Sequence, residues 1–207
     1  MSLSNYLEAV ELRKQMLLHM IETRNLGKTT ASEKFVTLCK ELNCAPFLLK
    51  PIIKEEVVLH PGNEAEKEIY EKARRGSCFG TSLFLIRHFS EARSLSDQKL
   101  INFLQENRRK WVGIQIRHLV LCELGIESTR LMPKACPTEE ASSALFFYSY
   151  DKEQGHCIYA QLVPPYRFVD IRLGVRSFET KEALVTALRE MPGFDDAYYY
   201  KEVDNGS

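Results

Sequence analysis

The chain has 207 residues, of which 44% are hydrophobic and 27% charged, a composition typical of a globular protein. Its 28 basic and 28 acidic residues give a formal net charge of zero, which argues against a nucleic-acid binder that works by bulk charge. No apolar run reaches the ~18–20 residues of a membrane span, and the first ten residues lack the basic and apolar regions of a conventional secretory signal. We therefore expect a cytoplasmic protein with reduced thiols.

The first half of the chain is predicted to be helical. Ser4 caps a first helix, whose apolar residues follow the helical period up to a stop at Gly27. Thr30 and Glu33 form the pattern of a capping box at the start of a second helix. The apolar face of this second helix contains Phe35, Leu38, Cys39 and Leu42. We expect the pair to pack on the main body of the protein rather than to serve as a partner surface.

The predicted domain boundary follows a proline-containing stretch. Residues 44–62 carry three prolines and are predicted to be mostly loop, with a short strand at 57–59. We therefore assign residues 1–62 to an N-terminal helical extension or subdomain and residues 63–207 to the main domain, unless the two form one continuous domain. The main domain opens on a charged, helix-favouring segment at 64–75.

The character of the sequence changes after Gly76. Small and polar residues at 77–82 lead into an almost fully apolar run that ends at Phe89. A helix that is apolar on most sides is a buried central helix. A further helical stretch is predicted from about residue 96 to residue 123, with a break near 107–110.

The second half of the chain is predicted to form strands. Aromatic and β-branched residues dominate four segments between turn signals, namely 144–150, 156–163, 166–173 and an edge strand at 198–200. An amphipathic helix at 180–191 comes between the last two, with Ala183, Leu184, Ala187, Leu188 and Met191 facing inward. Helices followed by an antiparallel sheet predict an α+β fold.

Six cysteines lie at positions 39, 44, 78, 122, 136 and 157. None forms a Cys-x-x-Cys pair and no His-Glu-x-x-His motif accompanies them, so we expect no metal site. Most should be small buried side chains. Cys39 and Cys122 fit this interpretation best, because both continue apolar stripes on predicted helices.

Cys78 differs from the other cysteines because it stands at the predicted start of a buried helix. The unsatisfied amides and the dipole at a helix N-terminus favour the thiolate, which is the nucleophilic form. Arg74 and Arg75 precede it, and Gly76 and Gly80 would let a substrate backbone approach closely. The alternative is a buried structural cysteine.

His156 and Asp170 complete a candidate catalytic group. His156 opens a predicted strand after Gly155, where its side chain can face a cleft and act as a general base. Asp170 lies near the end of the next strand, and a carboxylate there would orient the imidazole. The alternatives are a strand-end histidine bonded to a turn carbonyl and an ordinary acid paired with Arg167 or Arg172.

These residues, in this order, resemble the papain-like clan of cysteine proteases, and most closely the YopT-like branch of bacterial effectors. The resemblance covers about residues 70–190 and rests on Gly76-Ser77-Cys78-Phe79-Gly80-Thr81-Ser82, Gly155-His156, and Phe168-Val169-Asp170-Ile171-Arg172-Leu173-Gly174. It implies a papain-like fold whose buried nucleophile helix packs on the antiparallel sheet.

The resemblance also implies residue roles. Cys78 would be the nucleophile, His156 the base and Asp170 its orienting acid, with Gly76, Ser77 and Gly155 beside a protein or peptide substrate. No cofactor is implied. The branch further implies an effector that acts inside a host cell and reaches it without a conventional signal peptide.

Two departures from the family pattern stand out. Papain-like enzymes usually carry an Asn or Gln shortly before the nucleophile, as a donor to the oxyanion, and residues 71–77 contain neither. The backbone N–H of Cys78 would then serve alone, or Asn63 or Gln154 would fold in. Loss of one such donor costs about 10²–10³ in rate. In addition, Asp170 lies in Val-Asp-Ile-Arg rather than before a polar turn.

Three other interpretations remain open from the sequence. A transglutaminase-like hydrolase shares the Cys-His-Asp order, and Tyr159 only loosely matches the aromatic residue that usually follows its His. A catalytically inactive papain-like domain could bind a protein. In a purely structural protein, Cys78, His156 and Asp170 would never meet. The contact between the Cys78 sulfur and the His156 ring separates the last interpretation from the others.

Overall fold

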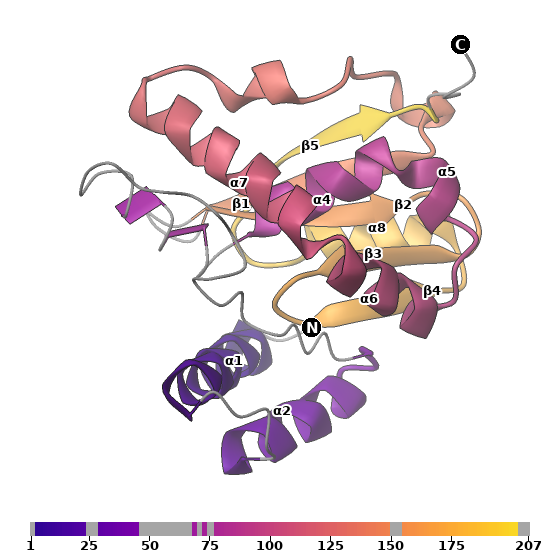
Figure 1. The fold of residues 1–207 in the computed structure, drawn as a ribbon. Helices are drawn as coiled ribbons and strands as arrows, with labels where there is room; N and C mark the ends of the chain where they lie inside the picture. The colour runs from indigo at the N-terminus through magenta and orange to yellow at the C-terminus, as the bar shows by residue number, and fades with distance from the viewer. Residues whose placement is uncertain are drawn as a thin grey trace.

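The elements follow the predicted order of helices and then strands (Figure 1). The computed structural model describes residues 3–23, 29–45, 68–69, 72–73, 77–149 and 155–202. Its α-helices are α1 (Leu3–Thr23), α2 (Thr30–Glu41), α4 (Cys78–Arg87), α5 (Phe89–Ala92), α6 (Asp97–Glu106), α7 (Arg108–Glu123) and α8 (Lys181–Arg189). Short 3-10 helices are η2 (Ser128–Leu131) and η3 (Thr138–Glu140). The strands are β1 (Ser143–Ser149), β2 (Gly155–Gln161), β3 (Tyr166–Asp170), β4 (Gly174–Phe178) and β5 (Phe194–Tyr200). The predicted α+β class is confirmed.

The five strands form one antiparallel sheet in the order β4-β3-β2-β1-β5. The strand predicted at 166–173 ends earlier, at Asp170, because residues 171–173 form a tight turn that leads into β4, a strand that was not predicted. Gly174 makes this possible with a φ of 103°, a conformation that suits glycine, and its Cα pairs with that of Asp170. The predicted edge strand is present as β5 and begins four residues earlier, at Phe194.

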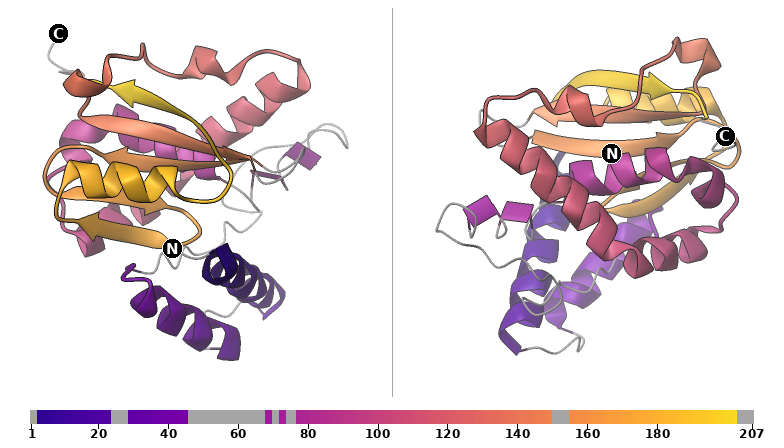
Figure 2. Two further views of the ribbon diagram at one scale, coloured as in Figure 1. Left: turned by 180° about the vertical axis from the view of Figure 1, so that it is seen from behind. Right: turned by 45° about the horizontal axis from the view of Figure 1, so that its top comes forward.

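Alternating residues of the strands face two separate cores. On one face, α4, α5, α6 and α7 pack on residues such as Leu145, Tyr159 and Val169. On the other face, α1, α2 and α8 share a core with Phe146, Ile158, Ala160 and Phe168. Figure 1 shows the α4–α7 group in front of the sheet and α8 behind it, and the left view of Figure 2, seen from behind, shows α8 in front. Because successive side chains of a strand point to opposite faces, one strand serves both cores.

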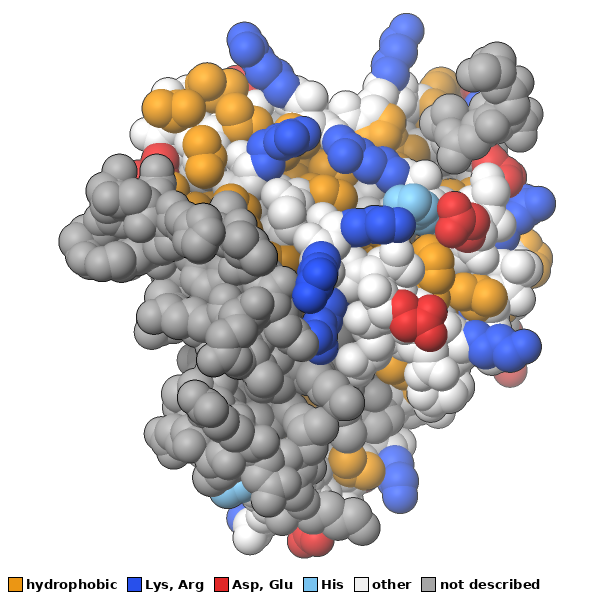
Figure 3. All heavy atoms as spheres, viewed as in Figure 1, with side chains coloured by type: hydrophobic (Ala, Val, Ile, Leu, Met, Phe, Trp, Pro, Cys, Tyr) orange, Lys and Arg blue, Asp and Glu red, His pale blue; other side chains and the backbone are white. Residues whose placement is uncertain are grey.

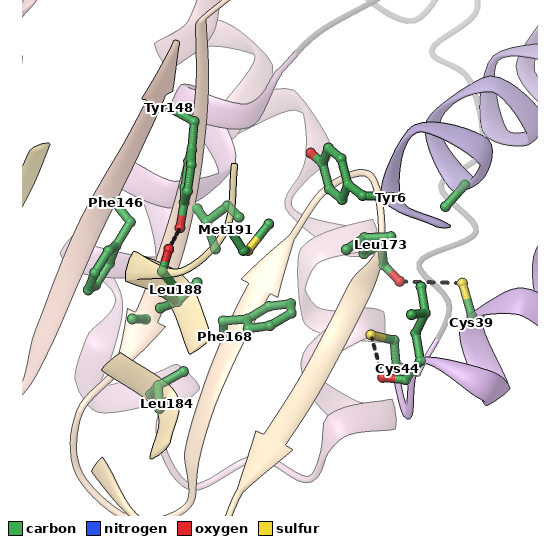
Figure 4. Close-up of a cluster of buried hydrophobic side chains, with 14 of the residues drawn as sticks. Tyr6, Cys39, Cys44, Phe146, Tyr148, Phe168, Leu173, Leu184, Leu188 and Met191 are labelled. Carbon is green, nitrogen blue, oxygen red and sulfur yellow. Dashed lines mark hydrogen bonds between the residues drawn. The ribbon is translucent and has the colours of Figure 1, made fainter. Parts of the chain in front are cut away.

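The N-terminal helices pack on the turn between β3 and β4. The Cys39 thiol of α2 lies 3.7 Å from the Leu173 carbonyl oxygen, as drawn in Figure 4, and Ala45 forms an isolated bridge with Val175. The helical pair therefore shares one core with the sheet, as we expected. The boundary proposed at residue 62 lies outside the described residues.

Several local predictions shift by a few residues. The capping box of α2 is formed by Thr29 and Ser32, one position before the predicted pair. Helix α1 begins at Leu3, so Ser4 lies within it. Asn107 ends α6 where a break was expected. Of the charged segment 64–75, residues 68–69 and 72–73 are described and helical, whereas the predicted stop at Gly27 and strand at 57–59 lie outside the described residues.

Exposure corrects two other predictions. Cys39 is fully buried as expected, but Cys122 is exposed on α7, because the C-terminal half of that helix extends beyond the core. Ala183 is also exposed, whereas Leu184 and Leu188 are fully buried. Figure 3 shows apolar side chains on the surface at the upper left, where α7 ends in Figure 1, and Lys and Arg side chains spread across the same face. Among the described helices, none is long and apolar enough to cross a membrane.

Candidate active site

The first component of the candidate site is the N-terminus of α4. Cys78 is the first residue of this helix, so its amide is among those that have no partner within the helix. Ser77 precedes it, is buried, and donates its hydroxyl to the Ala73 carbonyl. The Ser77 hydroxyl is therefore held by the preceding backbone, and its role beside a substrate stays a prediction. Cys78 itself is partly exposed and can be reached from solvent.

The second component is the His156 side chain near the start of β2. Its ring lies between two tyrosines, with ring centres 6.4 Å from Tyr6 and 6.3 Å from Tyr148. Strand alternation places it on the same face as Ile158 and Ala160, which belong to the core with α1 and α8. The imidazole therefore packs against two aromatic rings, and its side chain is fully buried.

Asp170, the last residue of β3, pairs with this imidazole. The His156 Nε2 atom lies 3.1 Å from the Asp170 Oδ1 atom, and the two strands are antiparallel neighbours. The backbone N–H of Arg172 donates to the same oxygen at 2.6 Å. The predicted hydrogen bond between neighbouring strands is confirmed. The alternative partner Arg167 pairs instead with Asp97, at 2.9 Å.

The thiol of Cys78 completes the group, because it lies close enough to the His156 side chain for each group to shift the pKa of the other. Three side chains that are far apart in the sequence thus lie in one row, in the order thiol, imidazole and carboxylate. The interpretation in which they never meet is wrong.

The surroundings of Cys78 favour its thiolate. Burial by itself would raise the pKa of the Cys78 thiol, but the hydrogen bond and the charge of His156 outweigh it, so the pKa is lowered. The Arg172 side chain and the backbone N–H of Cys157 add to this lowering. The backbone N–H of the residue directly after His156 therefore also stabilises the thiolate.

The pKa values of the other two residues, His156 and Asp170, are shifted in opposite directions. Burial would lower the pKa of His156, yet the charge and the hydrogen bond of Asp170 raise it above its ordinary value. Burial would raise the pKa of Asp170, and His156 with the Arg172 amide lowers it. The shifts together favour a thiolate–imidazolium pair beside an ionised carboxylate.

Gly80 allows α7 to lie directly against the start of α4. Its backbone N–H donates to the Gln115 Oε1 atom of α7 at 2.8 Å. A side chain at this position would collide with the carbonyl oxygen of Trp111. The role of Gly80 is thus close helix packing, and its amide is not offered to a substrate oxyanion.

Sequence reasoning missed the contribution of α1. Tyr6 is buried against His156. The pKa of Arg13 is affected by the charges of Asp170, Arg172 and Cys78. The two residues are seven positions apart, which is two helical turns on one face, so the spacing was available as a signal. Nothing in the local sequence, however, indicates that this face packs on the site.

The remaining predicted site residues fall into two groups. Gly155 is exposed at the start of β2, and an added Cβ there would come no closer than 3.9 Å to the Tyr148 oxygen, so a substrate backbone has room. The others lie outside the described residues, namely Arg74, Arg75, Gly76, Asn63 and Gln154. Within the described part of the chain, no cluster of three or more His, Cys, Asp or Glu residues could hold a metal ion.

Comparisons with known proteins do not place the chain in a family. No protein-family model, no curated protein and no solved structure matches it.

Proposed function

We propose that the protein is a cysteine peptidase of papain-like type, in which Cys78 is the nucleophile, His156 the general acid and base, and Asp170 the orienting carboxylate. The observation that carries this proposal is the single imidazole that joins the Cys78 thiol to the Asp170 carboxylate. A partly exposed thiol next to a buried histidine–aspartate pair is the arrangement that nucleophilic catalysis requires.

The first half of the reaction would form a thioester. The Cys78 thiolate attacks the scissile carbonyl carbon, a C–S bond forms, and the carbonyl electrons move onto oxygen. The oxyanion then collapses, the C–N bond breaks, and the His156 imidazolium gives its proton to the departing amine. Asp170 keeps the ring oriented and stabilises its positive charge throughout.

The second half would release the acid and restore the enzyme. A water molecule attacks the thioester carbon while neutral His156 takes one of its protons. A C–O bond forms, the C–S bond breaks, and the products are a carboxylic acid and the Cys78 thiolate beside an imidazolium. Protons and charges therefore balance over the cycle without any further reactant.

The start of α4 supplies the electrostatic support for the oxyanion. Amides at a helix N-terminus lack partners within the helix and carry partial positive charge, and Cys78 is the first residue of this helix. Gln115 is buried, and its amide oxygen accepts the Gly80 N–H between α7 and α4, so the proposal does not use it in place of the family's usual amide donor. We therefore assign the oxyanion to the Cys78 backbone N–H and expect a slow enzyme.

The proposal extends to the biological setting only through the sequence resemblance. A nucleophile helix packed on an antiparallel sheet supports the papain-like placement, and the YopT-like motifs favour an effector that cleaves host proteins inside a cell. The second candidate function, an inactive papain-like domain that binds a protein, is favoured by the missing side-chain amide.

The decisive experiment compares the wild type with Cys78→Ala on a proteome-derived peptide library read by mass spectrometry. Wild type should generate new peptide termini, and Cys78→Ala should reduce turnover to background, about 10⁴-fold or more. His156→Ala should behave alike, and Asp170→Asn should lose less. The free energy of unfolding of Cys78→Ala should change by about 1 kcal/mol or less, because one sulfur atom at a cleft is removed.

Cys122→Ala is the matched control, since it removes an exposed thiol that also contacts a histidine. It should keep wild-type turnover. Hydrolysis that survives Cys78→Ala would move the chemistry elsewhere. A wild type that cleaves no peptide would favour the protein-binding alternative.

A further inference from the structure

Helix α7 packs on the rest of the protein with one side. Its buried residues are Trp111, Val112 and Gln115, and Gln115 accepts the Gly80 N–H of α4. An α-helix turns by about 100° per residue, so a second set of residues lies on the opposite side of α7. This outward face of α7 consists of six exposed residues, namely Arg109, Lys110, Gly113, Arg117, Val120 and Leu124.

The first half of the outward face carries only positive charge. Helix α7 contains four Lys and Arg residues and a single acidic residue, Glu123, whose carboxylate lies 3.4 Å from the Lys72 ammonium group. Within the described part of the chain, Arg109, Lys110 and Arg117 form no ion pair. No described acid therefore neutralises this cluster, although the net charge of the whole chain is zero.

Helix stability does not explain why these cations stand at the start of α7. Helices α2, α5, α6 and α8 each carry an acidic residue in the first turn, which the helix dipole favours. The first turn of α7 has no acidic residue and reads Arg108-Arg109-Lys110. Positive charges at this end destabilise a helix, and residues that break a local rule in this way are expected at functional surfaces.

The second half of the outward face ends in apolar side chains. Val120 is 37% exposed and Leu124 is 66% exposed. Among the described residues, they are two of the three large hydrophobic side chains that are exposed, and the third is Leu7 of α1. They stand one helical turn apart. Figure 3 shows this face, with apolar side chains where α7 ends and Lys and Arg side chains across it.

We propose that the outward face of α7 binds the surface of a membrane that contains anionic lipids. Lys and Arg side chains are attracted to anionic headgroups, and exposed apolar side chains on the same helix enter the boundary between headgroups and acyl chains. The cations would therefore lie along the headgroups, and Val120 and Leu124 would insert at the end of the helix.

The shape of the outward face favours a membrane over an acidic protein. The face is the convex side of a single helix, and Lys110 and Arg117 are separated by roughly 10 Å along its axis. An acidic protein would need carboxylates fixed at this spacing, together with a pocket for the apolar end. A layer of mobile headgroups adapts to both features. The inference does not depend on the proposed peptidase activity.

The first measurement is the sedimentation of the full chain with lipid vesicles. Vesicles of phosphatidylcholine alone are compared with vesicles that also contain about 30% phosphatidylserine. Wild type should bind the anionic vesicles about tenfold or more tightly than the neutral ones. Raising the NaCl concentration from about 0.1 M to about 0.5 M should remove most of this difference, because salt screens the charges.

The charge contribution is tested by a triple variant of the outward face. Arg109→Gln, Lys110→Gln and Arg117→Gln together should weaken binding to anionic vesicles by about 100-fold, because each cation near such a surface contributes about fivefold. The control variant combines Lys34→Gln, Lys40→Gln and Arg189→Gln. It removes the same charge from exposed positions on α2 and α8, across the sheet from α7, and should bind within about threefold of wild type.

The apolar contribution is tested by one matched pair of substitutions. Leu124→Gln should weaken binding to anionic vesicles by about tenfold, because the leucine side chain no longer leaves water. Leu7→Gln is the control, since it alters an equally apolar and exposed side chain on α1, and it should bind like wild type. Thermal melts verify that every variant folds.

Three results would overturn the inference. These are the absence of binding to anionic vesicles, equal losses in the two triple variants, and a Leu124→Gln variant that binds like wild type. Binding to a soluble polyglutamate peptide but not to vesicles would identify an acidic protein as the partner instead.

The two proposals fail in distinguishable ways, because Cys78→Ala should bind vesicles like wild type. Vesicle binding that depends on the outward face, in a protein that cleaves no peptide, would overturn the peptidase and leave the membrane surface in place. Peptide cleavage by a protein that binds no vesicles would do the reverse.

Discussion

The protein contains two contacts between a thiol and an imidazole, in very different surroundings. Cys78 lies next to His156 at the buried end of β2. Cys122 lies next to His118, one turn away on the exposed part of α7, and its sulfur is 3.8 Å from Nδ1 and 3.9 Å from Nε2 of that ring. The two contacts are close to each other, because Phe79 stacks on the His118 ring at 4.2 Å. Their chemistry should nevertheless differ greatly.

The main difference between the two pairs is the carboxylate of Asp170 next to His156, which we expect to make the first pair the more reactive. Burial lowers the pKa of His118, which keeps that ring neutral at pH 7. His156 is buried as well, yet Asp170 raises its pKa and leaves it able to hold a proton against the thiolate. Removal of the carboxylate should therefore make the first pair resemble the second.

Asp170→Asn tests this with the largest expected effect on stability. The substitution keeps an oxygen acceptor but leaves His156 and Arg172 without their buried counter-charge. We expect the free energy of unfolding at pH 6 to fall by about 3 kcal/mol, or about 6–12 °C in Tm for a protein of this size. Glu202→Gln is the control, because its pair with Arg93 is partly exposed and should contribute about 1 kcal/mol or less.

The pH dependence of this loss follows from the directions of the two pKa shifts. The raised pKa of His156 contributes stability that is complete below about pH 6.5 and disappears as the pH rises through the higher folded value. The lowered pKa of Asp170 contributes stability above about pH 4 that disappears as the pH falls. The difference between wild type and Asp170→Asn should thus be largest between about pH 4 and 6.5. A loss of equal size at pH 9 would contradict it.

Parts of this site were predictable from the sequence because they depend on local rules. Strand alternation and a short connection placed His156 beside Asp170, and a glycine before an apolar run placed Cys78 at a helix start. β4 was missed because Gly174 was interpreted as the end of a strand, whereas it begins one. Arg13 was missed for a different reason, since the packing of one helix face on a distant sheet leaves no local pattern.

The close approach of α4 and α7, which sets the distance between the two pairs, depends on Gly80. In Gly80→Ala, the new Cβ would collide with the Trp111 carbonyl and come within 2.9 Å of the Gln115 backbone nitrogen. We expect a loss of about 2 kcal/mol, although alanine is the better helix former. Gly113→Ala is the matched control on exposed α7, where nothing lies within 4 Å, and should gain about 0.5–1 kcal/mol. Chemical denaturation measures the free energy of unfolding of both variants. A Gly80→Ala variant as stable as wild type would mean that α4 and α7 can move apart at little cost in free energy.

The smallest expected effect is the most direct measure of the difference between the two thiols. Because the pKa of Cys78 is lowered, part of this thiol stays ionised below its ordinary pKa. In the same pH range the thiolate fraction of an ordinary thiol falls about tenfold for each pH unit. A thiolate of lower pKa is intrinsically a weaker nucleophile, which offsets part of this advantage but not its pH dependence. The ratio of iodoacetamide labelling at Cys78 to that at Cys122 should therefore rise about tenfold between pH 8.5 and pH 6.

Mass spectrometry of the alkylated peptides measures that ratio within one sample, so protein concentration and reagent decay cancel. Cys39 and Cys44 serve as internal references for inert thiols, because burial raises the pKa of both to about 12, and they should stay unlabelled over the whole range. His156→Gln should flatten the pH dependence at Cys78 and leave Cys122 unchanged. If the ratio is constant with pH in wild type, or if Cys122 reacts first at pH 6, then the imidazole next to Cys78 does not activate it and the two pairs are chemically equivalent.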